Sequence, residues 1–527
     1  MANSSSPLLT NHNDEENTNP YNFCHSPRNK NTSVNDKIEQ CIENLGWAQI
    51  VQCLLVSLAW AFDAQQAFIS IFTDTEPSWH CTTGSCGDDI CSLKGQTWAW
   101  DAPLETSIIS EWGLQCVSSL ITGLPASSFF IGCVIGGLVL ATLADTWLGR
   151  KNLLILCTLA MSLSGIFTAL FSSNIWIYAF LRFVSGFGRA AIGTCSLVLA
   201  TEVVGKQWRG QIGVIGFFFF SFGFLSLPGI AYLNQGHSWR NMYIWTSAPA
   251  LIYSVLVFIF VKESPRWLLI RGRREEAMDA LKNFATLHQS SLTLSFFGEE
   301  ETSCGNDINV FSAMKNMVSR AWALRRLITV SFISIGIGMI YYGMPLALGN
   351  LPMNLYLSVS LNALSELPGL FLTFVLVDRL SRRSAIIGFT LVSGISSIFV
   401  VGAGHFAKNN EYIMFLQIGF EMLSFLCGVS ALNLMLIFTC ELFPTCVRNS
   451  ALSMARQALV FGGAFAPPLV AAGRNIPFIA YGVFGVVIGV CGSFAIFLPE
   501  TRGTTLTDTL EEEEFQAQRL GSFWATH

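Results

Sequence analysis

Six ionisable side chains lie within long apolar stretches of the chain, where they could hold a charged solute. They are Asp63, Arg182, Arg189, Glu366, Glu421 and Arg456. An ionisable group in hydrocarbon costs several kcal/mol, so it persists where it pairs with an opposite charge or lines a polar cavity. Each residue alone could form a structural pair. Acids and bases spread over at least five stretches favour a shared polar cavity.

Aromatic residues add a second kind of binding surface. Tyr341 and Tyr342 are adjacent in one stretch, and Phe217 to Phe220 form a run in another. Organic cations are attracted to the faces of aromatic rings, and a nearby carboxylate strengthens the attraction. Tyr341 is therefore a candidate, whereas consecutive Phe residues point around a whole helix and mostly face lipid. The expected binding residues are Asp63, Arg189, Tyr341, Glu366, Glu421 and Arg456.

The stretches that carry these residues have the length of transmembrane helices. Only 12% of the 527 residues are charged, whereas soluble domains carry about 25%. A helix needs roughly 20 apolar residues to cross a bilayer. The sequence thus predicts an all-α polytopic membrane protein with about twelve spans. They lie near 46–72, 117–142, 152–171, 176–199, 210–234, 242–261, 327–350, 353–377, 384–404, 412–438, 450–473 and 477–498.

Three charged motifs occur twice in the same order. Asp145 with Arg150 corresponds to Asp378 with Arg382, and the Glu202–Arg209 spacing of seven recurs in Glu441 and Arg448. Glu263 with Arg266 corresponds to Glu500 with Arg502. The offsets are 233, 239 and 237 positions, so the chain contains an internal duplication. Duplicated membrane chains are typical of transporters, and two pseudo-symmetric halves of six helices are expected.

The cationic residues fall in alternate loops, which the positive-inside rule assigns to the cytosol. This gives a cytosolic N-tail that lacks apolar runs and is expected to be disordered. The expected domains are the N-tail 1–43, the first half 44–262, the cytosolic loop 263–326, the second half 327–498 and the cytosolic C-tail 499–527.

The segment 73–116 is expected on the non-cytosolic side, and it carries seven acidic residues against one lysine. It also carries Cys81, Cys86, Cys91 and Cys116. Four cysteines in such a compartment suggest two disulfides with three possible connectivities, and free thiols are the alternative.

Several motifs resemble the major facilitator superfamily. Lys262–Leu269 (KESPRWLL) resembles its motif after the sixth helix, and Leu498–Gly503 (LPETRG) resembles its motif after the last. Ser107–Cys116 (SIISEWGLQC) and Glu441–Asn449 (ELFPTCVRN) resemble the organic cation and anion transporters. The resemblance covers about 44–505 and is closest to the plant organic cation/carnitine transporters.

The resemblance implies a secondary transporter that works by alternating access, without ATP. Cation-transporting relatives carry an acid at the position of Val460, and carnitine or anion carriers have Arg near there; here Arg456 lies one turn earlier. We therefore expect organic cations or zwitterions such as carnitine as substrates. The family's gating role is expected for the charged motifs Asp145, Arg150, Lys151, Glu202, Arg209, Glu263, Arg266, Asp378, Arg382, Arg383, Glu441, Arg448, Glu500 and Arg502.

Other functions fit the sequence less well. A sugar or organic-anion transporter of the same fold is the alternative, and a non-transporting receptor or scaffold would have no need of intramembrane charges. No metal-ligand spacing, nucleophile elbow or phosphate loop occurs, so an enzyme, a metal and a cofactor are not expected. The net charge of −5 makes nucleic acid an unsuitable partner. The expected partners are the lipid bilayer, the substrate and, if transport is coupled to an ion, a proton or sodium ion. The protein is expected to function as a monomer. Plasma and vacuolar membranes both fit.

Overall fold

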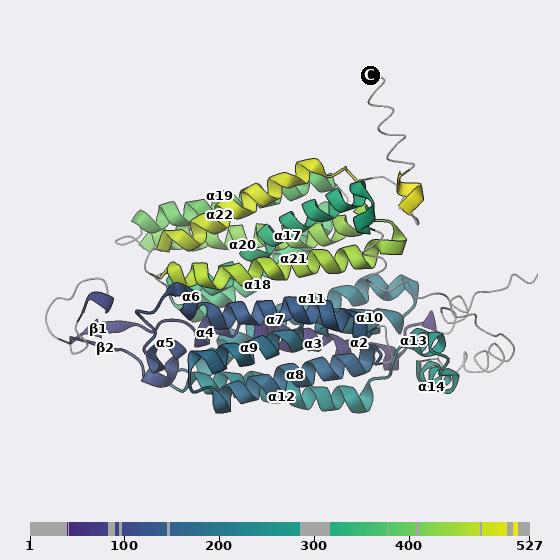
Figure 1. Ribbon diagram of the computed structural model, residues 1–527, viewed down its shortest axis with the longest axis horizontal. Helices are drawn as coiled ribbons and strands as arrows, with labels where there is room; N and C mark the ends of the chain where they lie inside the picture. Colours follow the sequence, from purple (N-terminus) through teal and green to yellow (C-terminus); the bar gives the residue numbers. More distant parts are fainter. Residues whose placement is uncertain are drawn as a thin grey trace, which may run out of the picture.

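Long apolar helices run side by side through most of the molecule (Figure 1). The computed structural model describes residues 39, 42–82, 90–93, 97–144, 148–284, 317–351, 353–377, 379–406, 411–474, 477–502 and 510–514. Asp145, Asp378, Cys86, most of the two tails and half of the loop between the halves lie outside these ranges.

The first half of the chain forms one group of helices, called the N-terminal half. Its first span consists of three consecutive segments, and its fourth span of two. The helices are α2 (Trp47–Ser57), α3 (Ala59–Phe68), α4 (Ser70–Thr73), α7 (Leu124–Ala144), α8 (Arg150–Phe171), α9 (Ile175–Arg189), α10 (Ile192–Glu202), α11 (Arg209–Leu233) and α12 (Trp239–Phe260).

The second half forms a matching group beside the first, called the C-terminal half (Figure 1). Its helices are α17 (Ala321–Ala347), α18 (Leu355–Val377), α19 (Arg382–Phe406), α20 (Glu411–Leu442), α21 (Thr445–Ala472) and α22 (Pro477–Ser493). α7 packs against α21 and α11 against α18, so these helices join the two halves.

Within the described ranges, ten helices are long and apolar enough to cross a membrane. α7 contains a shorter apolar segment, Leu124–Leu140, and the 28-residue α21 is more polar. Both run alongside the ten in the bundle (Figure 1). The prediction of an all-α membrane fold with about twelve spans is confirmed.

Glycine allows corresponding helices in the two halves to approach closely. A Cβ at Gly223 of α11 would overlap the carbonyl oxygen of Ala61 in α3. A Cβ at Gly462 of α21 would overlap that of Ile335 in α17. The two glycines are 239 positions apart, the same offset as Glu202 and Glu441. Small residues at helix contacts let backbones pack closely in membranes, so the duplication is also visible in the packing.

Short elements lie at both ends of the bundle (Figure 1). We call the end with β1 (Trp79–Cys81) and β2 (Trp98–Trp100) the outer side, and the opposite end the inner side. The strands pair antiparallel, with Trp79 opposite Trp100. The outer side also holds η1 (Ile90–Ser92), η2 (Leu104–Thr106), α5 (Ile108–Glu111) and α6 (Ser119–Thr122). The inner side holds η3 (Lys206–Trp208), α13 (Pro265–Ile270) and α14 (Arg274–Phe284). Two further short helices continue spans at their ends: η4 (Leu348–Asn350) follows α17, and η6 (Phe494–Phe497) follows α22.

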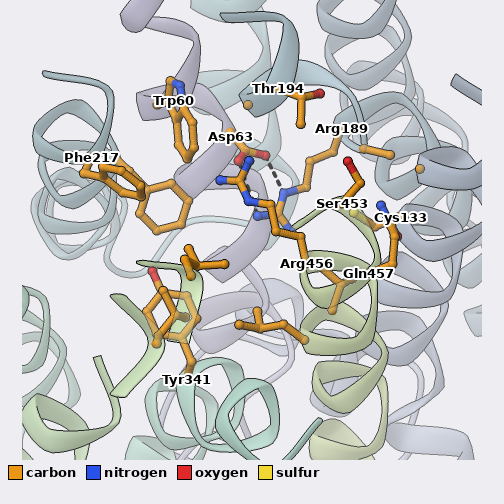
Figure 2. Close-up of a pocket in the computed structure, with 18 of the residues that line it drawn as sticks. Trp60, Asp63, Cys133, Arg189, Thr194, Phe217, Tyr341, Ser453, Arg456 and Gln457 are labelled. Carbon is orange, nitrogen blue, oxygen red and sulfur yellow. Dashed lines mark hydrogen bonds and ion pairs between the residues drawn. The ribbon is translucent and has the colours of Figure 1, made fainter. Parts of the chain in front are cut away.

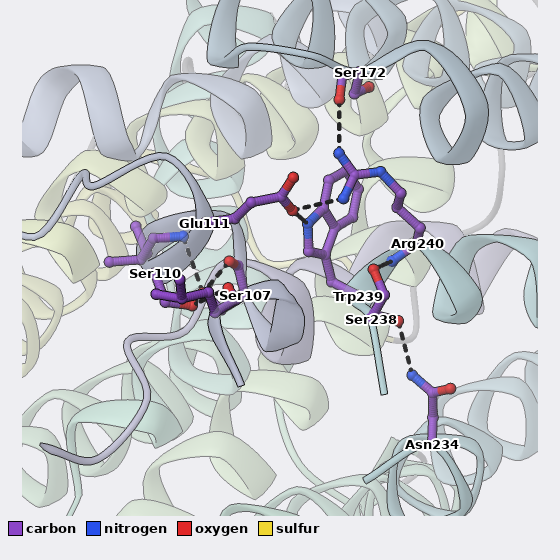
Figure 3. A network of polar contacts seen from close by, with 10 residues as sticks. Ser107, Ser110, Glu111, Ser172, Asn234, Ser238, Trp239 and Arg240 are labelled. Atoms are coloured by element: carbon purple, nitrogen blue, oxygen red, sulfur yellow. Dashed lines mark hydrogen bonds and ion pairs between the residues drawn. The ribbon is translucent and has the colours of Figure 1, made fainter. Parts of the chain in front are cut away.

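A polar network fixes the outer segment to the N-terminal half (Figure 3). Glu111 Oε2 accepts hydrogen bonds from Trp239 Nε1 and Arg240 Nη1, both at 2.6 Å. Arg240 Nη2 also donates to the carbonyl oxygen of Ser172 at 3.0 Å. A disulfide joins Cys91 to Cys116, and Cys81 is disulfide-bonded as well. The free-thiol alternative is therefore wrong for these three cysteines.

Candidate binding cavity

A cavity of about 210 Å³ lies between the two halves and is lined by both (Figure 2). Five of the predicted binding residues line it: Asp63, Arg189, Tyr341, Glu366 and Arg456. The N-terminal half supplies residues from α3, α7, α9, α10 and α11, and the C-terminal half supplies residues from α17, α18, α20 and α21. The lining includes Leu138 near the inner end of α7 and Ser450 near the inner end of α21, so the cavity extends toward the inner side.

Glu421, the sixth predicted binding residue, does not line this cavity, and its assignment is corrected here. It is fully buried in α20, and its Oε1 accepts a hydrogen bond from Asn362 Nδ2 at 2.8 Å. The sequence marks a buried acid but not the face of the helix from which it projects. Glu421 faces α18 instead of the space between the halves.

Asp63 and Arg189 form a buried ion pair between α3 and α9 (Figure 2). Arg189 Nε contacts Asp63 Oδ1, and Arg189 Nη2 donates to Asp63 Oδ2 at 3.3 Å. Both side chains are almost completely buried. The pair neutralises itself, so it contributes no net charge to the cavity.

Glu366 is held by hydroxyl groups from both halves. Ser221 Oγ of α11 donates to its Oε2 at 2.6 Å, and Tyr341 Oη of α17 donates to its Oε1 at 2.9 Å. Hydrogen bonds donated to both oxygens fix the orientation of the carboxyl group. Among the described residues, no cation forms an ion pair with Glu366.

Arg456 of α21 provides a positive charge to the lining, next to Asp63 and Arg189 (Figure 2). Its guanidinium carbon lies 5.7 Å from the ring centroid of Trp60. Within the described part of the chain it forms no hydrogen bond and no ion pair with a carboxylate, although Asp63 is close enough to act on its charge. After the Asp63–Arg189 pair is set aside, one carboxylate and one guanidinium remain available to a solute.

Aromatic rings surround Tyr341. Its ring centroid lies 6.4 Å from that of Phe220, 6.0 Å from that of Phe425 and 6.3 Å from that of Phe68. The Phe run of α11 divides as a helix requires. Phe217 and Phe220 line the cavity, whereas Phe218 is 55% exposed on the surface of the bundle.

Three uncharged polar residues of the lining were not among the predicted binding residues. Trp60, Asn433 and Gln457 line the cavity, and each has a buried polar atom without a hydrogen-bond partner in the described part of the chain. Charge is what makes a residue conspicuous in an apolar sequence. A tryptophan or amide has no such signal, although orphaned polar atoms beside a cavity are available to bind a ligand.

Arg182, the one intramembrane charged residue that was not predicted to bind substrate, does not line this cavity. Its Nη1 donates to the carbonyl oxygen of Gln66 and its Nη2 to Ser70 Oγ, both at 3.1 Å. Its guanidinium carbon also lies 4.2 Å from the ring centroid of Phe129. These contacts hold α3, α4, α7 and α9 together.

The cavity is closed toward the outer side by contacts between the halves. Ser127 Oγ of α7 donates to the carbonyl oxygen of Ala464 in α21 at 2.8 Å. The rings of Phe130 and Tyr342 have centroids 4.7 Å apart. A Cβ on Gly123 would lie 2.7 Å from Pro468 N, so the backbones touch there.

The repeated motifs form two charge networks on the inner side. In the C-terminal half, Arg382 Nε lies 3.1 Å from Glu441 Oε2, and the backbone N–H groups of Arg382 and Arg383 donate to Glu500. Arg448 Nε donates to the carbonyl oxygen of Phe443, and the backbone N–H of Arg502 donates to Glu500.

The network of the N-terminal half has a similar plan. Arg150 lies 3.9 Å from Glu202, and the backbone N–H of Lys151 donates to Glu263 Oε2 at 3.0 Å. Burial raises the pKa of Glu263, and the backbone donors and the charge of Arg150 oppose this rise. Arg209 and Arg266 both pair with Glu39 of the N-tail, an acid that the motif analysis missed. In this conformation each of these contacts joins residues of one half.

Comparisons with known proteins agree with this architecture. Residues 61–512 match the family model described as "Sugar (and other) transporter". The chain is 53% identical to organic cation/carnitine transporter 3 of Arabidopsis thaliana and 52% identical to transporter 2, and each match covers 98% of both chains. The fold matches the xylose transporter XylE of E. coli with a TM-score of 0.60 at 18% identity, over 87% of this chain and 99% of that one.

These relatives are transporters, and none is named as an enzyme. The match covers almost the whole chain at more than half identity, and the helical bundle has the same fold as a solved transporter. The chain belongs to the plant organic cation/carnitine transporter family of the major facilitator superfamily.

Proposed function

We propose that this protein moves organic cations or zwitterions such as carnitine across the membrane by alternating access. The observation that carries the proposal is the charge of the cavity. Glu366 and Arg456 line it, and neither forms an ion pair with another of the described residues. A solute with an ammonium head and a carboxylate tail complements such a pair.

The ammonium head would lie near Glu366 and the rings around Tyr341. A trimethylammonium group has no N–H donors, so it is bound by carboxylate charge and by aromatic faces. Tyr341 already donates to Glu366. This headgroup needs an aromatic ring and a carboxylate close together in one wall. The relatives are named organic cation/carnitine transporters, which points to the same class of substrate.

The carboxylate tail would lie against Arg456. A guanidinium binds a carboxylate with two parallel hydrogen bonds, and Arg456 forms no ion pair with a carboxylate of the described residues. Arg189 is a weaker candidate than the sequence suggested because Asp63 already occupies it. The sugar and organic-anion alternatives are less well supported, since neither substrate uses Glu366 as a counter-charge.

Alternating access would require the two halves to rock about this cavity. The outer contacts at Ser127 and Ala464 would open as the inner side closes. The charge networks at the inner ends would then come together and stabilise the outward-facing state. We assign the gating role to these networks as part of the proposal, together with operation as a monomer in the plasma or vacuolar membrane.

Uptake by the purified protein in liposomes tests the proposal. Radiolabelled choline and carnitine should enter, and unlabelled carnitine, choline and other organic cations should compete while glucose should not. Repeating the assay with and without a pH or sodium gradient identifies the coupling ion. Competition by glucose with no effect of carnitine or choline would overturn the proposed substrate class.

A further inference from the structure

A second cavity, separate from the first, lies on the outer side between the two halves. Its volume is about 790 Å³, within the range of roughly 300–1,000 Å³ that is usual for ligand pockets. Asp74 and Glu76 at the end of the first span and Trp79 of β1 form one wall. Asn350 at the end of η4 and Arg474 after α21 form the other.

Three helices show that the two cavities are distinct. Along α7, Ala126 lines the outer cavity and Cys133 lines the central one. Along α21, Pro467 and Val470 line the outer cavity, and along α17 Leu346 does so while Tyr341 lines the central one. Between them lie the hydrogen bond from Ser127 to Ala464 and the contact of Phe130 with Tyr342.

Asp74, Glu76 and Arg474 are the only charged residues that line the outer cavity within the described part of the chain, so the lining has an excess of one negative charge. None of the three forms an ion pair with another described side chain. Arg474 Nη2 donates instead to the carbonyl oxygen of Asp74 at 2.6 Å.

Asp74 is held in position by the N-terminal half. Its Oδ1 accepts hydrogen bonds from Tyr178 Oη at 2.7 Å and from Thr73 Oγ1 at 2.8 Å. Its Oδ2 is buried and has no hydrogen-bond partner among the described residues. The side chain is only 8% exposed. The charges of Arg182 and Arg474 act on this carboxylate, but neither arginine forms an ion pair with it among the described residues. A buried carboxylate oxygen without a donor is costly, so the site favours a bound cation.

The geometry points to an outer binding site for organic cations, formed by Asp74, Glu76 and Trp79, where the substrate is held before it reaches the central cavity. This inference rests on the proposed function. The carboxylates attract the ammonium head, and Trp79 offers an aromatic face to it. Glu111, Trp239 and Arg240 fix the outer segment to the N-terminal half (Figure 3), which keeps this wall in place while the C-terminal half moves.

Choline transport measured separately from each side of the membrane tests this site. Right-side-out and inside-out vesicles present choline to the outer and the inner side. Glu76→Gln should raise KM for choline on the outer side roughly three- to tenfold, because a lost negative charge weakens capture. It should leave Vmax and the inner-side KM within twofold. Glu76→Asp retains the charge and should retain the outer-side KM.

A matched control is Glu105→Gln, which removes another acid of the same outer segment that is exposed and does not line the cavity. It should leave both KM values unchanged. An unchanged outer-side KM in Glu76→Gln would overturn the site, as would equal changes on both sides, which indicate a structural role. Failure of the wild-type protein to transport choline would instead overturn the proposed function.

Discussion

Tyr341 donates a hydrogen bond from its hydroxyl group to Glu366 Oε1 at 2.9 Å, across the space between α17 and α18. Ser221 of the other half donates to the second oxygen at 2.6 Å. The carboxylate thus lies where the two halves meet. A substrate bound there contacts both halves and can favour their rearrangement.

Replacing Glu366 by Gln should reduce choline uptake about tenfold or more, because a lost contact with a buried charge is worth at least about 1.4 kcal/mol. The amide retains the size of the side chain. Glu421→Gln is the matched control, since Glu421 is equally buried but lies outside the cavity. Initial uptake rates at equal protein abundance give the comparison, and equal losses in both variants would contradict the assignment of Glu366.

Asp63→Asn should destabilise the protein strongly. The substitution leaves Arg189 buried without its counter-charge, and breaking a buried ion pair in this way costs about 3–5 kcal/mol. Thermal unfolding in detergent measures the effect as a lower Tm. The double variant Asp63→Asn, Arg189→Gln removes both charges and should recover part of the loss. A double variant less stable than either single one would indicate that the two residues do not act as a pair.

Arg382→Ala should slow transport and leave equilibrium choline binding within about twofold. Arg382 pairs with Glu441 at the inner end of the bundle, and neither residue lines the central cavity. Uptake rates and binding to the purified protein are the two measurements. Arg273→Ala offers a control, because Arg273 forms an exposed pair with Glu276. Loss of binding with normal folding would count against a gating role.

Cys91→Ser should lower thermal stability without changing the central cavity. The disulfide to Cys116 closes a separation of 25 residues, and loops of this size give roughly 3 kcal/mol of stabilisation in the chain-entropy model. A reducing agent should lower the Tm of the wild-type protein and have less effect on the variant. An identical Tm for both proteins would show that the bond contributes nothing to stability.

The spans were predicted within a few residues where apolar runs end abruptly, and less well where helices continue into polar sequence. α17 begins at Ala321, before the predicted 327, and includes Arg325 and Arg326. α21 begins at Thr445, before the predicted 450. The prediction began too late because the charged Arg448 lies in the first turn of this helix and lowers its hydropathy there. Hydropathy detects the part of a helix in hydrocarbon, and the inner ends extend beyond it.

The site was partly predictable because charges are rare in membrane spans. Five of the six expected binding residues line the cavity, and Glu421 does not, since a sequence cannot specify its neighbour across the bundle. Trp60 and Gln457 carried no signal. Glu39 was missed because an acid in a polar tail resembles any other, although it pairs with both Arg209 and Arg266.

The most direct test of the central claim compares carnitine with choline in Arg456→Gln. Both substrates carry a trimethylammonium group, but only carnitine carries a carboxylate. If the cavity holds a zwitterion between Glu366 and Arg456, the variant should lose carnitine uptake about tenfold or more and keep choline uptake within about threefold. Glu366→Gln should reduce both. Equal losses of carnitine and choline in Arg456→Gln would contradict the zwitterion site and leave Arg456 with a structural role.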